Sequence, residues 1–145
     1  MKIVLQRVSG ASVKVNGEIL GQIGRGYVLL LGIGGDDNCE KADRMVEKIS
    51  KLRLFPDSNG KTNLSISDIK GEILVISQFT LYADCRKGTR PSFTEAAPLA
   101  LAEALYEYFI QKATPYFEKV ACGKFGASMQ VELVNDGPFT VVLEG

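Results

Sequence analysis

The first 33 residues are runs of strand-forming residues separated by one very tight turn. Residues 2–8, 11–15 and 18–23 alternate or are rich in β-branched residues, and Asn16-Gly17 separates the last two of these runs. Asn-Gly between such runs is the strongest short-range signal of a hairpin, because both residues tolerate a positive φ. Residues 26–33 are apolar without alternation, which is typical of a strand covered on both faces. The chain is therefore predicted to open as a β-meander.

Two later segments change to the spacing of helices. Residues 37–54 place apolar side chains three and four positions apart, and Asp37 with Glu40 forms a plausible capping box at their start. Residues 95–112 show the same spacing, and Pro115 then stops or kinks that helix. We therefore expect two main helices.

The remaining strands lie in the second half of the chain. Residues 71–81 read as a buried strand that ends in polar residues. Residues 128–134 alternate, residues 135–138 form a turn, and residues 139–143 read as the closing strand. No repeat or linker divides the chain, so one α+β domain spanning residues 1–145 is the simplest prediction.

Composition excludes several classes of function. The chain has no histidine, which removes Ser-His-Asp and Cys-His nucleophiles and zinc sites that need imidazole. Lys and Arg number 17, and so do Asp and Glu, so the formal net charge is zero and no basic footprint for a long nucleic-acid duplex is present. A short nucleic-acid end stays possible.

The three cysteines, Cys39, Cys85 and Cys122, are far apart and read as free thiols in a reducing compartment. No apolar run approaches the length of a membrane span. The predicted location is the cytoplasm.

The strongest candidate site is Ser77-Gln78-Phe79-Thr80, at the end of the apolar strand. Functional residues are common where a chain leaves its core, but Ser, Thr and Gln also occur at strand ends for purely structural reasons. A nucleophilic Ser77 or Thr80 would need a base, and the sequence places none beside them. The hydroxyls are better suited to hydrogen bonding.

Three further segments have two interpretations each. The loop of residues 84–93 carries three cations and could hold phosphates or be simply solvated. Phe125 and Met129 could flank a flat base or belong to the core. The Gly137-Pro138 bond could be an ordinary trans turn or a rigid cis feature.

In this order along essentially the whole chain, these motifs resemble the D-aminoacyl-tRNA deacylase (D-tyrosyl-tRNA deacylase) family. Each motif alone is weak, but the ordered set is specific. The matching segments are Gln6-Arg7-Val8, Ser77-Gln78-Phe79-Thr80-Leu81, Lys87-Gly88-Thr89-Arg90-Pro91-Ser92-Phe93, Phe125-Gly126-Ala127-Ser128-Met129 and Asn135-Asp136-Gly137-Pro138-Phe139-Thr140.

The resemblance implies a hydrolase that cleaves the ester between a D-amino acid, or mischarged glycine, and the 3′-terminal adenosine of tRNA. It implies a homodimer with two helices packed on a barrel-like sheet, no metal or other cofactor, and no membrane or DNA partner. It implies that the catalytic aminoacyl site consists of Ser77, Gln78, Phe79 and Thr80. Gly137 and Pro138 would form a Gly-cisPro chirality filter that inserts into the other subunit, and Arg7 would support that motif. Phe125 and Met129 would contact the adenosine.

The same resemblance implies that the ribose 2′-hydroxyl of the substrate assists the reaction. One departure from the family pattern is Phe139, where the smaller Val is expected. The intact Ser-Gln-Phe-Thr favours the D-specific branch over a related subclass that edits L-alanine. The alternatives are a non-catalytic protein that binds the tRNA 3′ end and a structural dimerisation module.

Overall fold

The computed structural model describes all 145 residues, and its longest feature is a curved antiparallel hairpin. Strand β1 (Lys2–Val15) turns at Asn16 and Gly17, whose φ angles of 51° and 83° confirm the predicted turn. Strand β2 (Glu18–Ile23) pairs with the second half of β1, and β3 (Gly26–Gly32) pairs with the first half. Strands β2 and β3 therefore lie end to end along one edge of β1, so the opening is a long hairpin and not a meander of successive neighbours.

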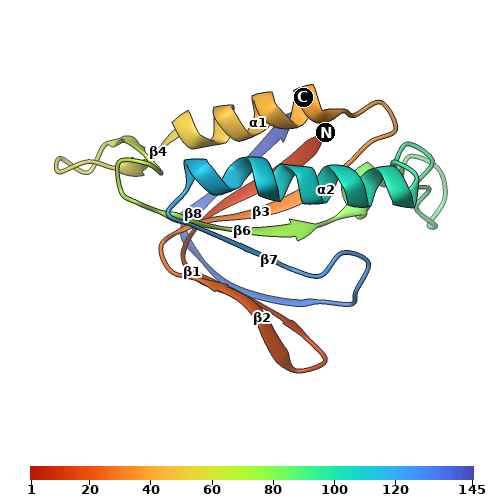
Figure 1. Cartoon of the computed structure of the whole chain (residues 1–145), viewed down its shortest axis with the longest axis horizontal. Helices are drawn as coiled ribbons and strands as arrows, with labels where there is room; N and C mark the ends of the chain where they lie inside the picture. Colours follow the sequence, from red (N-terminus) through yellow and green to blue (C-terminus); the bar gives the residue numbers. More distant parts are fainter.

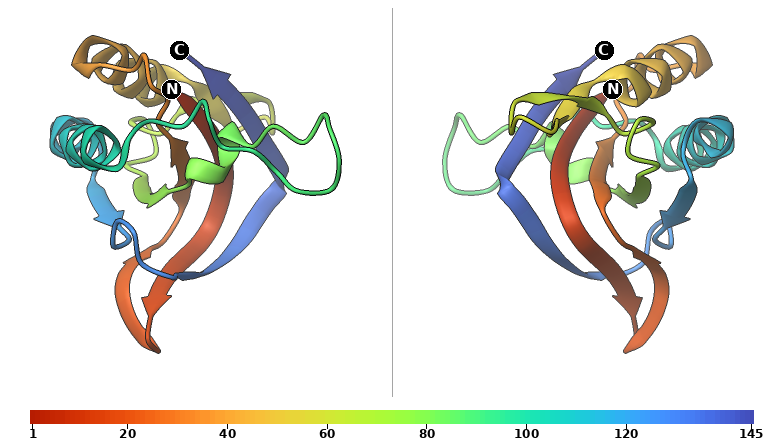
Figure 2. Two further views of the ribbon diagram at one scale, coloured as in Figure 1. Left: turned by 90° about the vertical axis from the view of Figure 1, so that its right-hand side faces the viewer. Right: turned by 90° about the vertical axis from the view of Figure 1, so that its left-hand side faces the viewer.

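The hairpin extends into a mixed sheet that curls toward closure (Figures 1 and 2). Strand β6 (Glu72–Ser77) is parallel to β3, β7 (Lys119–Cys122) is parallel to β6, and β8 (Gln130–Glu144) is antiparallel to β1. Strand β2 bends back toward β7, where the Lys119 ammonium donates to the Gln22 carbonyl at 2.7 Å. The predicted α+β domain with a barrel-like sheet and two main helices is confirmed.

Helices α1 (Cys39–Lys51) and α2 (Leu99–Ala113) lie side by side over one face of the sheet (Figure 1). Their apolar stripes are buried, as the spacing predicted, and α2 passes into a short 3₁₀ helix, η2 (Thr114–Tyr116), at Pro115. A small hairpin of β4 (Arg53–Pro56) and β5 (Thr62–Ser65) adds Phe55 to the core under the helices. A second apolar cluster fills the concave side of the sheet, and its members are Val8, Ala11, Val13, Ile23, Val28, Leu74, Ile76 and Ala121.

The predicted capping box at α1 is wrong. The N-cap is Asn38, whose side chain accepts a hydrogen bond from the Lys41 N–H at 3.0 Å. Asp37 is instead buried, where it accepts hydrogen bonds from the Met1 amine at 2.5 Å and the Gly34 N–H at 2.7 Å. Burial alone would raise the pKa of Asp37, but these hydrogen bonds, the ammonium charge and Lys41 outweigh it and hold the pKa below its ordinary value.

Two other expectations at the ends of strands are corrected. Strand β6 ends at Ser77, and the chain continues as the 3₁₀ helix η1 (Phe79–Tyr82). Residues 128–143 do not form two strands around a turn, because β8 stays on β1 throughout and residues 135–139 bulge from it. The register skips from Thr140 opposite Gln6 to Asn135 opposite Val8. Five positions of β8 therefore correspond to two positions of β1, and the extra residues form the bulge.

No helix in the structure combines the length and the apolar character needed to span a membrane.

Candidate active site

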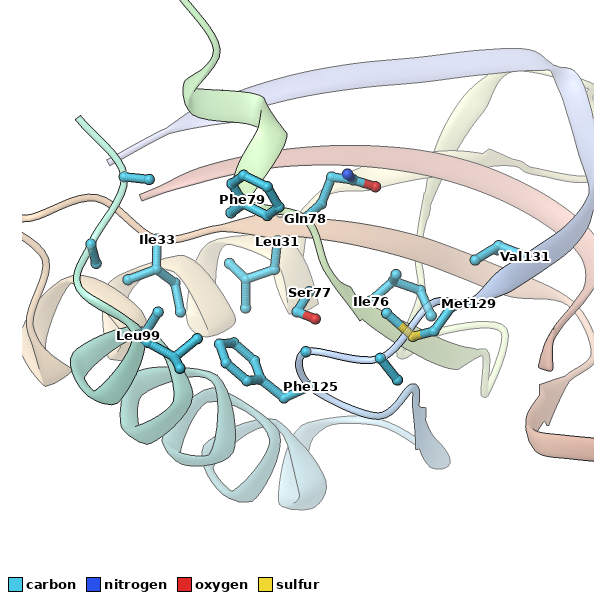
Figure 3. A pocket seen from close by; sticks show the side chains of 15 residues that line it. Leu31, Ile33, Ile76, Ser77, Gln78, Phe79, Leu99, Phe125, Met129 and Val131 are labelled. Atoms are coloured by element: carbon cyan, nitrogen blue, oxygen red, sulfur yellow. The ribbon is translucent and has the colours of Figure 1, made fainter. Parts of the chain in front are cut away.

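A cavity of about 610 Å³ opens where the carboxyl ends of β3 and β6 meet the start of α2 and the segment before β8. Figure 3 shows side chains from these four segments pointing into it. The lining is mostly apolar and contains no Asp, Glu, Lys or Arg; it consists of Leu31, Ile33, Ile76, Ser77, Gln78, Phe79, Ala96, Ala97, Leu99, Ala102, Phe125, Gly126, Ala127, Met129 and Val131.

Three of the four predicted aminoacyl-site residues line this cavity. The Gln78 N–H donates to the Leu31 carbonyl at 2.8 Å, and the chain then leaves the sheet as Gln78 adopts φ −144° and ψ 75°. Ser77 therefore remains the last residue of the strand, with its hydroxyl toward the cavity (Figure 3). Phe79 begins η1 at the rim, and 58% of its surface is exposed.

Thr80, the fourth, lies outside the lining of the cavity. It is exposed, and its hydroxyl accepts a hydrogen bond from the Gln78 side-chain amide. The first N–H groups of a helix have no acceptor in the preceding turn. The first hydrogen bond of η1 runs from the Leu81 N–H to the Gln78 carbonyl. The N–H groups of Phe79 and Thr80 come before it and therefore have no acceptor within the helix. These two amides can serve a ligand as donors.

The two residues predicted to contact adenosine lie on the opposite wall. The Phe125 ring packs 5.6 Å from the Tyr106 ring, centroid to centroid, and the Tyr106 hydroxyl donates to the Val75 carbonyl at 2.9 Å. Met129 lies over Gly123, where an added Cβ would stand 2.4 Å from the Met129 sulfur. Both side chains reach the cavity (Figure 3), and their contacts with Tyr106 and Gly123 hold the segment before β8 in place.

Arg7, Gly137 and Pro138 do not line the cavity of the same chain. Register places Arg7 opposite Tyr27, whereas the cavity residue Leu31 is opposite Ile3, four residues or about 13 Å further along the strands. The Arg7 side chain contacts the bulge directly: its Nε donates to the Asp136 carbonyl at 2.9 Å. The Gly137-Pro138 peptide bond is cis.

The bulge of residues 135–139 is closed by its own side chains. The Asn135 side-chain oxygen accepts from the Phe139 N–H at 2.6 Å, and its amide donates to the Thr140 hydroxyl at 3.1 Å. The Arg7 guanidinium lies 4.7 Å from the centroid of the Phe139 ring. Phe139, the residue that departs from the expected pattern, therefore gives Arg7 a cation–π partner.

The chemistry available in the cavity follows from its neutral lining. No cysteine lines the cavity, and Cys122, the half-buried one, has a pKa raised by burial, which disfavours a thiolate. No three Cys, Asp or Glu side chains gather as a metal-binding group. The cavity can therefore hold an apolar or flat neutral group and present backbone amides and the Ser77 hydroxyl to a polar one.

Sequence reasoning missed the helix-side wall of the cavity. Ile33, Ala97 and Leu99 lie there because the Ala97 N–H donates to the Ile33 carbonyl at 2.9 Å and joins the start of α2 to the end of β3. Their pattern is that of ordinary core residues. The one unusual sign, a Leu99 that is 72% exposed, appears only in the structure.

Known proteins resemble this chain over nearly its full length. The family described as D-Tyr-tRNA(Tyr) deacylase matches residues 4–144. The D-aminoacyl-tRNA deacylase of Thermosipho africanus (strain TCF52B) is 54% identical over 144 residues, covering 99% of this chain and 97% of the relative. That of Haemophilus influenzae (strain PittEE) is 54% identical over 140 residues, covering 97% and 96%.

Two solved structures have the same architecture. A c-Myc DNA unwinding element binding protein superposes with a TM-score of 0.94 at 45% identity, covering 100% of this chain and 99% of the other. A probable eukaryotic D-amino acid tRNA deacylase superposes with a TM-score of 0.87 at 17% identity, covering 98% and 97%. At that identity the second match shows the fold alone.

Proposed function

Because the chain belongs to the D-Tyr-tRNA(Tyr) deacylase family and acts as a D-aminoacyl-tRNA deacylase, we propose that the cavity beside Ser77 is where it hydrolyses the ester between a D-amino acid and tRNA. The observation that carries this proposal is an uncharged cavity with backbone donors at its rim. Such a site lacks the acid, base or nucleophile needed to cleave a stable bond, but it suits an ester that is already activated. We propose the cytoplasm as its location, because a deacylase must meet charged tRNA.

Catalysis in this site rests on position and on hydrogen bonds to the developing oxyanion. The Phe79 and Thr80 N–H groups stand at the start of η1 and have no intrahelical acceptor. Preorganised backbone donors of this kind typically contribute about 10²–10³ in rate each. The Ser77 hydroxyl, at the end of β6, orients the aminoacyl group.

The proton is handled by the substrate. None of the residues that line the cavity is charged or contains imidazole, so no side chain there is poised as a general base. The terminal ribose carries a 2′-hydroxyl next to the ester, and this group relays a proton from the attacking water to the 3′ oxygen that leaves.

The terminal adenosine binds against Phe125 and Met129. Both lie on the wall opposite Phe79 and present apolar surface to the cavity. A flat base packs on such surfaces through stacking and dispersion, without sequence-specific hydrogen bonds. This arrangement places the 3′ end of any tRNA in the same way.

A second copy of the chain completes the site and reads chirality. Strand β8 pairs only with β1, and its exposed side chains include Val134 and Val142, which are 63% and 66% exposed. An unpaired edge of this length favours association with another chain. In the homodimer, the partner inserts Gly137 and Pro138 into the cavity, with Arg7 holding the bulge.

The inserted backbone acts by exclusion. Main-chain atoms cannot rotate away as a side chain can, so an L side chain collides with them while a D side chain points elsewhere. Glycine has no side chain to exclude, so glycyl-tRNA is also a substrate.

The function is tested by incubating the protein with D-Tyr-tRNA and L-Tyr-tRNA and measuring the release of tyrosine. We expect release from the D form only. Equal release from both would overturn the chirality filter, and binding of tRNA without release would favour the non-catalytic alternative.

Substrate assistance is tested with D-Tyr-tRNA that ends in 2′-deoxyadenosine. Loss of general base catalysis typically costs 10²–10⁴ in rate, so we expect kcat to fall at least a hundredfold. Normal turnover of the deoxy substrate would show that a protein group handles the proton.

A further inference from the structure

The loop of residues 84–93 projects from the body of the protein between η1 and α2 (Figure 2). Two backbone hydrogen bonds close it: the Asp84 N–H donates to the Ser92 carbonyl at 2.7 Å, and the Ser92 N–H donates to the Asp84 carbonyl at 3.0 Å. Gly88 at its tip has a φ of 68°, which favours glycine. The loop is thus a narrow arm with a defined base.

Two of its three cations have no partner in the protein. The Arg86 guanidinium is bound by both oxygens of Asp84, at 2.8 and 2.7 Å. Lys87 and Arg90 are exposed, and neither forms an ion pair. The tip therefore presents two free positive charges in a chain whose net charge is zero.

The base of the arm is fixed to the rim of the cavity. The Phe93 ring contacts the Phe79 ring edge-on, with 5.0 Å between the ring centroids and 63° between the ring planes. Gly88 is the fourth residue after Asp84, so the tip lies up to about 13 Å from the base. A stacked nucleic-acid strand rises about 3.4 Å per nucleotide, so the arm reaches at most about three to four nucleotides from the cavity.

We propose that Lys87 and Arg90 bind the phosphates of the RNA strand that leads into the cavity, a few nucleotides before its terminal adenosine. This inference rests on the proposed function, because it requires the 3′ end to enter beside Phe79. Phosphate contacts position a strand without reading its sequence, so the arm orients the ester for every tRNA alike. The arm also gives a protein of zero net charge a local means of holding a polyanion.

The test compares two substrates for the double variant Lys87→Ala/Arg90→Ala. D-Tyr-tRNA carries the phosphates, and the small ester D-Tyr-adenosine lacks them. Each phosphate contact on a single strand contributes about 0.7 to the slope of log K against log salt. Loss of two contacts thus lowers the slope for uncharged tRNA by about 1.4 and weakens its binding about tenfold at 0.15 M salt.

We expect the ratio of kcat/KM for D-Tyr-tRNA to that for D-Tyr-adenosine to fall by the same factor. The control variant is Arg44→Ala/Lys51→Ala, which removes two cations from the exposed side of α1. It should change neither the ratio nor the salt slope.

An unchanged ratio and slope in the double variant would overturn the inference. So would an equal loss on both substrates accompanied by dissociation of the dimer in sedimentation, because the arm would then be a contact between subunits. Failure of the unaltered protein to hydrolyse either ester would instead refute the proposed function, while the salt slope for uncharged tRNA would still report on the arm.

Discussion

Replacing Arg7 with alanine tests whether one buried guanidinium holds the bulge that we propose as the chirality filter. The side chain is only 10% exposed and connects three segments. It donates to the Asp136 carbonyl at 2.9 Å and to the Leu54 carbonyl at 2.6 Å, and its guanidinium lies against the Phe139 ring. Its 3.5 Å approach to the half-exposed Asp136 carboxylate adds little, because solvent screens such pairs.

The size of the effect follows from these contacts. Hydrogen bonds from a charged donor are each worth about 1.5–3 kcal/mol, and a cation–π contact is worth about 0.5–2 kcal/mol. Because both carbonyl contacts are only partly buried, we take the lower values and expect Arg7→Ala to cost about 3–4 kcal/mol of the free energy of unfolding. Arg7→Lys keeps the charge but not the forked geometry, so we expect it to recover less than half of that loss.

The assay is urea unfolding of each variant at one fixed protein concentration, since dimerisation contributes to apparent stability. The matched control is Lys14→Ala, another cation on β1, whose exposed ion pair with Glu132 at 3.1 Å should be worth less than about 1 kcal/mol. Deacylation is measured in parallel, and the ratio of D-Tyr-tRNA to L-Tyr-tRNA hydrolysis should fall for Arg7→Ala. Surface substitutions usually change the free energy of unfolding by no more than about 0.5 kcal/mol. A change for Arg7→Ala within that range would refute the proposed role of Arg7.

Substitutions at Thr80, Asp37 and Gly26 test three other features of the structure. Thr80→Val removes a hydroxyl that lies outside the cavity, so deacylation should stay within about tenfold of normal; an acyl group trapped on Thr80 would reverse this assignment. Asp37→Asn should cost about 2 kcal/mol at pH 7 by weakening the contacts to the Met1 amine and the Gly34 N–H. Because the folded-state pKa of Asp37 is lowered, its contribution is complete above about pH 4 and is lost as the pH falls through that pKa, so the urea-measured difference should shrink at pH 3. Gly26→Ala should cost about 3 kcal/mol or more in thermal or urea unfolding, because the new Cβ would stand 1.8 Å from the Glu72 carbonyl oxygen, whereas Gly35→Ala, with nothing within 4 Å, should be nearly neutral.

Local patterns in the sequence predicted the elements whose causes are local. The Asn16-Gly17 turn forms because both residues adopt a positive φ, and the apolar stripe of α1 is buried because helical spacing places it on one face. The apolar run at residues 26–33 was predicted to be covered on both faces, and β3 is indeed almost wholly buried. Each of these features depends only on residues that are close together in the sequence.

Local patterns gave wrong predictions at two places where a distant segment binds the residues concerned. Asp37 has the right position for a capping box, but the Met1 amine and the Gly34 N–H claim its carboxylate, so Asn38 caps the helix. Residues 135–138 have the composition of a turn, yet β8 pairs with β1 on both sides of them, so they form a bulge within one strand. No pattern within either segment reveals its distant partner.

The sequence by itself determined which residues could serve a site without histidine, and it placed Ser77, Gln78 and Phe79 at the end of a buried strand. Only the tertiary structure decided that these three meet Phe125 and Met129 around one uncharged cavity, while Arg7, Gly137 and Pro138 lie elsewhere on the same chain. The physical reason is that a cavity is made by long-range packing: parallel pairing of β3 with β6 and docking of α2 bring together segments more than 40 residues apart. Strand and turn propensities carry no information about that docking, which depends on the apolar surface buried between the elements.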